Sequence, residues 1–157
     1  MINQKNRDVV KDTLDHLLTE FFHAVSFKTG EKPQYQNIHA LFIDSGLLIK
    51  NSGPTPEVSN ISQFIKLRQA LIDAGELTRF YEGELSETTE LFGNVAHRFS
   101  AYEKSGTMQS VPFETRGMIS TQFILTPAGW RMSVMAWDDE RPGLSISNEL
   151  PMPTNPA

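Results

Sequence analysis

The feature that most constrains this chain is a change in hydrophobic period near Glu76. Before this point, apolar residues recur at the three- and four-residue spacing of amphipathic helices, and after it apolar and polar residues alternate. The alternation predicts four long strands joined by connections that suit hairpins, at about 77–92, 94–104, 113–126 and 129–138. Helices followed by consecutive hairpins indicate an α+β fold, with the helices packed on the concave face of a curved antiparallel sheet.

Three helices are expected in the first half of the chain. A broad apolar stripe predicts a helix over about 8–27, and a short second helix fits 36–42. A small hairpin is expected around Asp44-Ser45-Gly46, because this triplet carries turn residues between two apolar runs. The third helix begins after Ser59 or Asn60, which can cap it, and ends at Gly75.

Length and composition limit the class of protein. A chain of 157 residues fits one domain, which we place at 1–140, followed by a Pro-rich tail at 141–157. The net charge of −5 and the scattered basic residues argue against nucleic acid as a partner. No apolar run is long enough to cross a membrane, and the N-terminal residues lack the apolar region of a signal peptide, so we expect a cytoplasmic protein.

The sequence contains no motif for a nucleotide cofactor or a catalytic metal. It has no cysteine, and its four histidines, at 16, 23, 39 and 97, lack the spacing of metal ligands. We therefore expect neither a cofactor nor a metal. The acidic run "EGELSETTE" also does not form one site by this reasoning, because strict alternation separates Glu87 from Glu82 and Glu84. A solvated strand edge is the expected role of the run.

The strand over 94–104 places a histidine among apolar neighbours. Val95, His97 and Phe99 share one face, whereas Arg98, Ser100 and Tyr102 share the other. Neither face of the last strands is fully polar, so both faces need cover. Helices would cover one of them and a second copy of the chain the other, which predicts a homodimer through the outer face of the sheet.

The order of elements resembles the nuclear transport factor 2-like superfamily, in particular its SnoaL-like branch. The resemblance spans about residues 8–140 and is carried by "HALFIDSGLLIKNSG", "HRFSAYE", "RGMISTQF" and "GWRMSVMAWDDERPG". It implies a cone in which the curved sheet and the helices enclose an apolar pocket, commonly in a homodimer. Members include isomerases, dehydratases, epoxide hydrolases, polyketide cyclases and binding modules without catalysis, so the fold does not fix the function.

The ketosteroid isomerases of this superfamily provide a residue-by-residue comparison. Their general-base aspartate corresponds to Lys50, their tyrosine to Phe21 or Phe22, and their protonated aspartate to Ser120. All three differences remove groups that the reaction needs. The resemblance therefore does not extend to isomerisation by that mechanism.

The resemblance also implies which residues face the pocket. His97 is the candidate catalytic residue, and the candidate ligand-binding residues are Phe99, Arg116, Met118, Ser120, Met135 and Trp137. Two hypotheses follow. The chain binds a small, partly apolar ligand with a carboxylate that Arg116 would hold, or it is a lyase, isomerase or cyclase in which His97 transfers a proton. A structural role for His97, hydrogen-bonded to Ser120, a backbone carbonyl or water, is the alternative to both.

Overall fold

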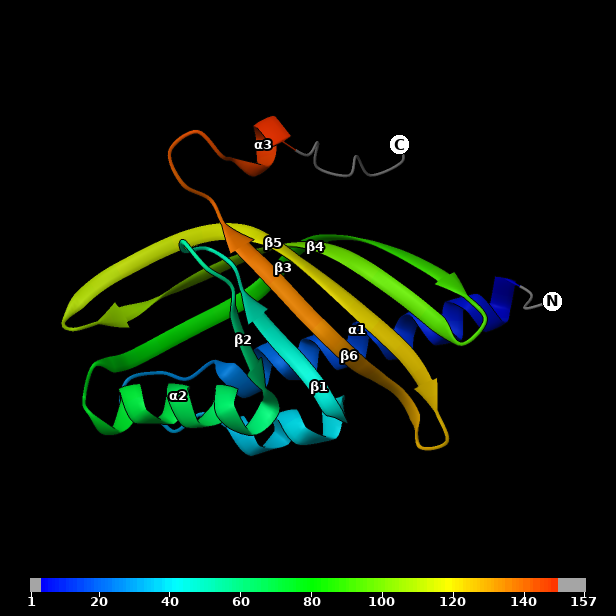
Figure 1. The fold of residues 1–157 in the computed structure, drawn as a ribbon, viewed down its shortest axis with the longest axis horizontal. Coiled ribbons are helices and arrows are strands. Elements are labelled where there is room, and N and C mark those ends of the chain that lie inside the picture. The colour runs from blue at the N-terminus through cyan, green and yellow to red at the C-terminus, as the bar shows by residue number, and fades with distance from the viewer. Residues whose placement is uncertain (1–3, 150–157) are drawn as a thin grey trace.

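A computed structural model describes residues 4–149 as helices packed against one curved sheet (Figure 1). The helical elements are α1 (Gln4–Val25), the 3-10 helix η1 (Tyr35–Leu41), α2 (Ile61–Asp73) and the short α3 (Ile146–Glu149). The strands are β1 (Phe42–Lys50), β2 (Glu57–Asn60), β3 (Leu77–Phe92), β4 (Val95–Met108), β5 (Val111–Thr126) and β6 (Gly129–Asp139). This architecture confirms the predicted α+β fold.

The sheet is mixed, with the strand order β2-β1-β6-β5-β4-β3. The four long strands form the predicted antiparallel hairpins, but β1 runs parallel to β6. The hairpin expected around Asp44-Ser45-Gly46 is wrong, because these residues form an irregularity inside β1. The chain turns instead between β1 and β2, where Pro54 and Pro56 stand.

The β4–β5 hairpin is longer than its sequence indicates. The stretch expected to be a loop continues both strands, and the turn is confined to Gln109 and Ser110. Both residues have positive φ, 50° and 65°, as a two-residue turn of the primed type requires. Neither is a glycine, which is why the turn gave no strong signal in the sequence.

The helices cover the inner, concave face of the sheet. α1 lies across it and contacts β3 and β6, while α2 packs beside β1, β2 and β3 (Figure 1). The side chain of Asn60 caps α2 as expected, and it accepts a hydrogen bond from the backbone N–H of Gln63 at 2.8 Å. Aromatic rings of α1, β1 and α2 meet in the core, where the ring of Phe21 contacts those of Phe42 and Phe64.

A β-bulge in β3 changes which acidic residues face inward. The pairing of β3 with β4 shifts between Glu84 and Ser86, so Leu85 is an extra residue and the alternation reverses beyond it. As a result Glu82, Glu84 and Glu87 all lie on the inner face, opposite Lys104, Tyr102 and Ser100. The expectation that Glu87 points away from the other two is therefore wrong.

Arg98 occupies the centre of the contact between α1 and the sheet. Its side chain is only 2% exposed, and its guanidinium binds the carboxylate of Glu84 through two hydrogen bonds of 3.0 and 2.6 Å. The third guanidinium nitrogen of Arg98 donates to Asp15 on α1, and Lys11 of the same helix bridges Asp15 and Glu87 at 2.8 and 2.7 Å. These ion pairs attach the first helix to β3 and β4.

The charges of this network hold one another ionised. Burial would raise the pKa of Asp15, but the hydrogen bonds from Lys11 and Arg98 outweigh it and hold that pKa below its usual value. Burial would also raise the pKa of Glu87, but hydrogen bonds from Lys11 and Thr89 outweigh it and hold that pKa below its usual value. The network therefore contributes stability above the usual carboxyl pKa and loses it in acid.

The C-terminal residues that the structure describes extend past β6. Arg141 and Leu144 form an isolated bridge, and Ile146 of α3 is buried. Residues 150–157 of the Pro-rich tail lie outside the described part of the chain. Within residues 4–149, none of the helices is long and apolar enough to span a membrane.

Replacing Arg98 tests whether this network holds α1 on the sheet. Arg98→Met leaves the buried carboxylate of Glu84 without its cation, so we expect a loss of about 3–5 kcal/mol in the free energy of unfolding, measured with urea. Arg116→Met removes an exposed ion pair with Glu140 and should change it by at most about 1 kcal/mol. The double variant Arg98→Met/Glu84→Met should recover part of the loss, and a loss no larger than that of Arg116→Met would contradict the assignment.

Candidate functional site

The candidate site is a cavity of about 850 Å³ between α2 and the inner face of the sheet. Its walls are mainly apolar and come from five strands and one helix: Leu48, Phe64, Leu67, Leu71, Leu77, Phe80, Met108, Phe113 and Trp137. Its charged residues are Lys50, Glu57, Arg68, Lys104, Asp139 and Glu140. Apolar walls with a few charged groups are typical of sites for small molecules.

Trp137 is the one predicted ligand-binding residue in this wall. Its ring meets that of Phe64 edge to face, with centroids 6.4 Å apart and an angle of 89° between the planes. Met135, two residues earlier on β6, also faces inward, but it is fully buried in the core and does not line the cavity. Both residues of β6 that the resemblance placed on the inner face thus lie there.

Arg68 of α2 holds its guanidinium between two aromatic rings. The carbon Cζ of Arg68 lies 4.9 Å from the centroid of the Phe64 ring and 4.9 Å from that of Phe80. Within residues 4–149, no carboxylate forms an ion pair with Arg68. The cavity therefore contains a stacked, half-buried cation without a bound anion.

Lys104 and Asp139 form the other charged part of the wall. The ammonium of Lys104 lies 2.9 Å from one carboxylate oxygen of Asp139 and 3.1 Å from the other. The buried hydroxyl of Tyr102 donates to the same carboxylate, and burial together with Asp139 raises the pKa of this phenol, so it stays protonated. The positive charge of Lys104 is thus already compensated within the protein.

Gly117 makes the contact between Tyr102 and Asp139 possible. It lies on β5 between the two residues, and a Cβ atom at this position would come within 2.2 Å of the Tyr102 hydroxyl and 2.3 Å of the Asp138 carbonyl oxygen. Any other residue would displace the phenol or the backbone of β6. A glycine is required here because neighbouring atoms leave no room for a Cβ atom. Its backbone conformation is not the reason, because its φ is not in the left-handed region.

Glu82 is the most perturbed carboxyl near this site. It is 8% exposed, and its side chain forms no hydrogen bond or ion pair with the residues that the structure describes. Burial raises the pKa of Glu82 to about 6, although the positive charges of Arg68 and Lys104 oppose the rise. This carboxyl therefore changes charge near neutral pH, in the range where a proton-transfer group works.

His97 does not lie where the resemblance placed it. Its side chain is 65% exposed on the outer face of the sheet, where Nε2 lies 3.1 Å from a carboxylate oxygen of Glu90. Phe99, Met118 and Ser120 lie on the same outer face, and none of them lines the cavity. The prediction that these four residues point into the pocket is wrong.

The physical reason is that the inner and outer faces of β4 are exchanged relative to the prediction. The residues expected to face a partner subunit, Arg98, Ser100 and Tyr102, are buried beneath the helices. Alternation separated the two faces of β4 correctly. The more apolar face was expected to be the inner one, but the inner face holds an ion-paired arginine, which the apolar character of a face does not reveal. In the register of the β4–β5 hairpin, His97 pairs with Gln122 and Glu103 pairs with Arg116.

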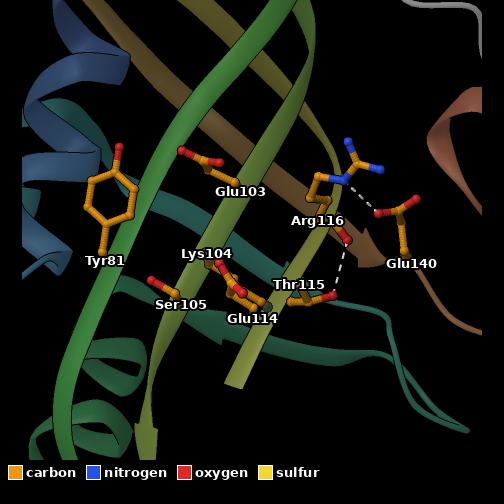
Figure 2. A pocket seen from close by; sticks show the side chains of 8 residues that line it. All are labelled: Tyr81, Glu103, Lys104, Ser105, Glu114, Thr115, Arg116 and Glu140. Atoms are coloured by element: carbon orange, nitrogen blue, oxygen red, sulfur yellow. Dashed lines mark hydrogen bonds and ion pairs between the residues drawn. The ribbon is translucent and has the colours of Figure 1, made fainter. Parts of the chain in front are cut away.

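Arg116 lines a second hollow, of about 590 Å³, on the outer face (Figure 2). Its Nε lies 3.0 Å from a carboxylate oxygen of Glu140, and Figure 2 shows the two side chains pointing toward each other. The other labelled side chains are mostly polar: Tyr81, Glu103, Lys104, Ser105, Glu114 and Thr115. Arg116 itself does not line the main cavity, although its partner Glu140 lines both hollows.

Sequence reasoning did not identify Arg68, Lys104 or Glu82 as site residues. For Arg68 a signal was present, because it lies four residues after Phe64 on the apolar stripe of its helix, where a charge is unusual. The bulge at Leu85 concealed that Glu87 faces inward together with Glu82 and Glu84. Among the described residues, no group of three or more histidine, aspartate or glutamate side chains is placed to hold a metal ion.

No family model matches the sequence, and no curated protein shows significant similarity to it. The structure, in contrast, is similar to many solved structures. One is a nuclear transport factor 2-like superfamily protein from Salmonella enterica, with 14% identity and a TM-score of 0.69, where the match covers 83% of this chain and 91% of that one.

Two further similar structures carry the names of enzymes. Hexachlorocyclohexane dehydrochlorinase LinA-type3 from Novosphingobium barchaimii has 9% identity and a TM-score of 0.73, and the match covers 88% of this chain and 92% of that one. A putative scytalone dehydratase from Novosphingobium aromaticivorans has 6% identity and a TM-score of 0.70, with 88% and 89% covered. At these identities the likeness concerns the fold alone, and it confirms the nuclear transport factor 2-like fold.

Glu82→Gln tests the burial of this carboxyl. The folded pKa of about 6 lies above the usual 4.5, so the folded state holds the proton more tightly and stability is lost as the pH rises through 6. Between pH 4 and pH 8 the free energy of unfolding of the wild type should fall by about 2 kcal/mol relative to Glu82→Gln. The control Glu31→Gln, at an exposed position, keeps Glu82 and should follow the pH profile of the wild type. Parallel pH profiles for Glu82→Gln and the wild type would refute the shift.

Proposed function

We propose that this chain, which has the nuclear transport factor 2-like fold, binds a small and partly apolar molecule that carries a carboxylate. The ligand would occupy the cavity between α2 and the inner face of the sheet. Its apolar body would lie against the aromatic and aliphatic wall formed by Phe64, Phe113 and Trp137. Its carboxylate would bind the guanidinium of Arg68.

The unpaired charge of Arg68 carries this proposal. The rings of Phe64 and Phe80, each with its centroid 4.9 Å from Cζ, favour the positive charge of Arg68 but supply no acceptor for its N–H groups. A half-buried cation without an anion is unfavourable, and a ligand carboxylate would supply the missing charge. Arg68 thus takes the role that the sequence reasoning gave to Arg116, which is already bound to Glu140.

The other cavity charges favour a single carboxylate on the ligand. Lys104 is paired with Asp139, and the carboxylate of Glu140 accepts from both Arg116 and the backbone N–H of Ile146. Lys50 is exposed at the rim, where it stands opposite Glu57 across the β1–β2 pair. Arg68 is therefore the cation of the cavity that a ligand anion would stabilise most.

An enzyme of the lyase, isomerase or cyclase type is the second candidate. His97 is poorly placed for proton transfer in this cavity, because it is exposed on the opposite face of the sheet. Glu82 supports this candidate better, since its pKa of about 6 suits a general acid or base. It pairs across the strands with Lys104, which lines the cavity, although Glu82 itself does not line it. If an acid that binds the cavity is also converted, Glu82→Gln should abolish the conversion and His97→Gln should leave it intact.

We also propose that two copies associate through the outer face of the sheet. The apolar part of this face includes Phe99 and Val95, which are 44% and 47% exposed, and the half-buried Met118 and Ile124. Large exposed apolar side chains on neighbouring strands favour a contact with another protein surface. The residues of this contact differ from those first expected, because Arg98, Ser100 and Tyr102 are buried on the inner face.

Ligand binding is tested with matched acids and amides. Naphthaleneacetate should raise the melting temperature of the wild type and bind in a calorimeter, whereas naphthaleneacetamide should bind more weakly. Arg68→Met should weaken binding of the acid by about tenfold or more, since a hydrogen bond to a charged group contributes about 1.5–3 kcal/mol. Lys66→Met removes an exposed charge from the same helix and serves as the control. Equal affinities of the wild type and Arg68→Met for a panel of aromatic and terpenoid acids would overturn the proposal.

Association through the outer face is tested by one charge substitution. Phe99→Asp should weaken the dimer by about tenfold or more, because it places a charge in the apolar contact, and analytical ultracentrifugation measures the change. Val9→Asp, at an exposed apolar position of α1, should leave the association unchanged. A wild type that sediments as a monomer at all concentrations would contradict the prediction.

A further inference from the structure

A groove lies between the end of α1 and the edge of the sheet. β3 is the outermost strand on its side, so one of its long sides has no neighbouring strand. Phe27, shortly after α1, covers part of this side through two backbone hydrogen bonds with Phe80, of 2.8 and 3.1 Å. Around this contact, the last turns of α1, the segment that follows it and residues 79–84 of β3 line a hollow of about 820 Å³. We call this hollow the α1–β3 groove.

Glu82 gives the groove a buried carboxylate without a partner. It is only 8% exposed, and its carboxylate forms no hydrogen bond or ion pair with the described residues. Within residues 4–149, the fully enclosed side-chain polar atoms that lack a hydrogen-bond partner are the hydroxyls of Tyr35 and Thr121. The carboxylate of Glu82 also lacks a partner but is not fully enclosed, and Glu82 lines the groove. A small group in the groove can therefore reach it.

The other charged residues of the groove leave Glu82 unpaired. Lys28 and His23 stand at exposed positions, and Arg79 donates a hydrogen bond of 3.2 Å to a backbone carbonyl of β4. Glu84, which also lines the groove, is already bound by two hydrogen bonds from the buried arginine of β4. Glu82 is thus the buried charge of the groove that has no counterion.

Charges on the far side of Glu82 compensate it only in part. Arg68 and Lys104, which line the main cavity, favour its ionised form, whereas Asp139 opposes it. Burial outweighs the two cations and raises the pKa of Glu82 to about 6. An additional cation close to this carboxylate would stabilise its charge.

The end of α1 also favours a cation in the groove. The hydroxyl of Ser26 accepts a hydrogen bond of 3.1 Å from the backbone N–H of Glu82 and donates one of 2.7 Å to the carbonyl oxygen of Phe22. These bonds fix the backbone of Glu82 beside the last turn of the helix, which ends at Val25. The C-terminal end of a helix carries a partial negative charge. The helix end and the carboxylate therefore attract the same kind of group.

We propose that the α1–β3 groove is a second binding site, separate from the main cavity, for molecules that carry a primary ammonium or guanidinium group. The cation binds the carboxylate of Glu82 through charge-assisted hydrogen bonds. The apolar side chains of the groove, which include Leu18, Phe22 and Phe27, contact the hydrocarbon stem of the ligand. A free amine and the lysine side chain of a peptide both offer this chemistry. The proposal does not depend on acid binding in the main cavity.

Glu82→Gln tests the role of the carboxylate at pH 8, where Glu82 is ionised. In a calorimeter, phenethylamine should bind the wild type more tightly than the uncharged 2-phenylethanol does. Glu82→Gln should weaken binding of the amine by about tenfold or more, because a hydrogen bond to a charged group is lost. Without ligand, the melting temperature of Glu82→Gln should equal that of the wild type or exceed it. Glu31→Gln, at an exposed position of the same groove, is the control and should change the affinity by about threefold or less.

Two further measurements locate the site. As the pH falls through 6, the carboxyl of Glu82 takes up a proton, so the amine affinity of the wild type should approach that of Glu82→Gln. In nuclear magnetic resonance spectra of the wild type with phenethylamine, the largest shifts of backbone amides should occur at Ser26, Phe27 and Glu82. N-acetyl-lysine methylamide, compared with its norleucine analogue, tests the lysine side chain as the source of the cation.

The outcomes are decisive for the groove. Binding of either cation with the expected dependence on Glu82 supports the site, and the tighter of the two probes indicates a free amine or a peptide as the source. Equal affinities of the wild type and Glu82→Gln at pH 8, or amide shifts centred on α2, would overturn the proposal. Absence of binding of both cations at millimolar concentration would also overturn it.

Discussion

The buried ion pairs of Arg98 decide how the rest of the structure is arranged. A fully buried guanidinium is tolerated only with nearby carboxylates, and it finds them in Glu84 on the adjacent strand and Asp15 on α1. Because one partner belongs to a helix, the face of β4 that carries Arg98 must be the face that the helices cover. His97, one residue earlier, must then point to the opposite side of the sheet.

The same choice of face builds the cavity. Tyr102 and Lys104 follow Arg98 on the inner side of β4, and they meet Asp139 of β6 across the gap that Gly117 leaves. This pairing neutralises one cation of the cavity wall. Arg68 forms no ion pair with the described residues, and α2 places its guanidinium beside the rings of Phe64 and Phe80. The recognition chemistry of the site thus follows from which charges find partners inside the protein.

Much of the fold could be predicted because it depends on local periodicity. The strands β3 and β6 begin and end within one residue of their expected positions, and the cap at Asn60 starts α2 as proposed. The candidate site could be predicted only in part. Trp137 was correctly expected to face the cavity, whereas Arg116 and His97 were not where the pattern placed them. A one-residue change of phase reverses every side chain of a strand, so an error in choosing the inner face moves a whole set of residues together.

The sequence by itself determined the elements, their order and the two alternating faces of each strand, because hydrophobic period and turn residues act over a few neighbouring positions. Only the tertiary structure decided which face is inner, since that depends on Asp15 and Arg98, which are 83 residues apart in the chain. It also decided that a bulge at Leu85 brings Glu87 to the same face of β3 as Glu82 and Glu84. These contacts join distant segments, and no local pattern in the sequence records them.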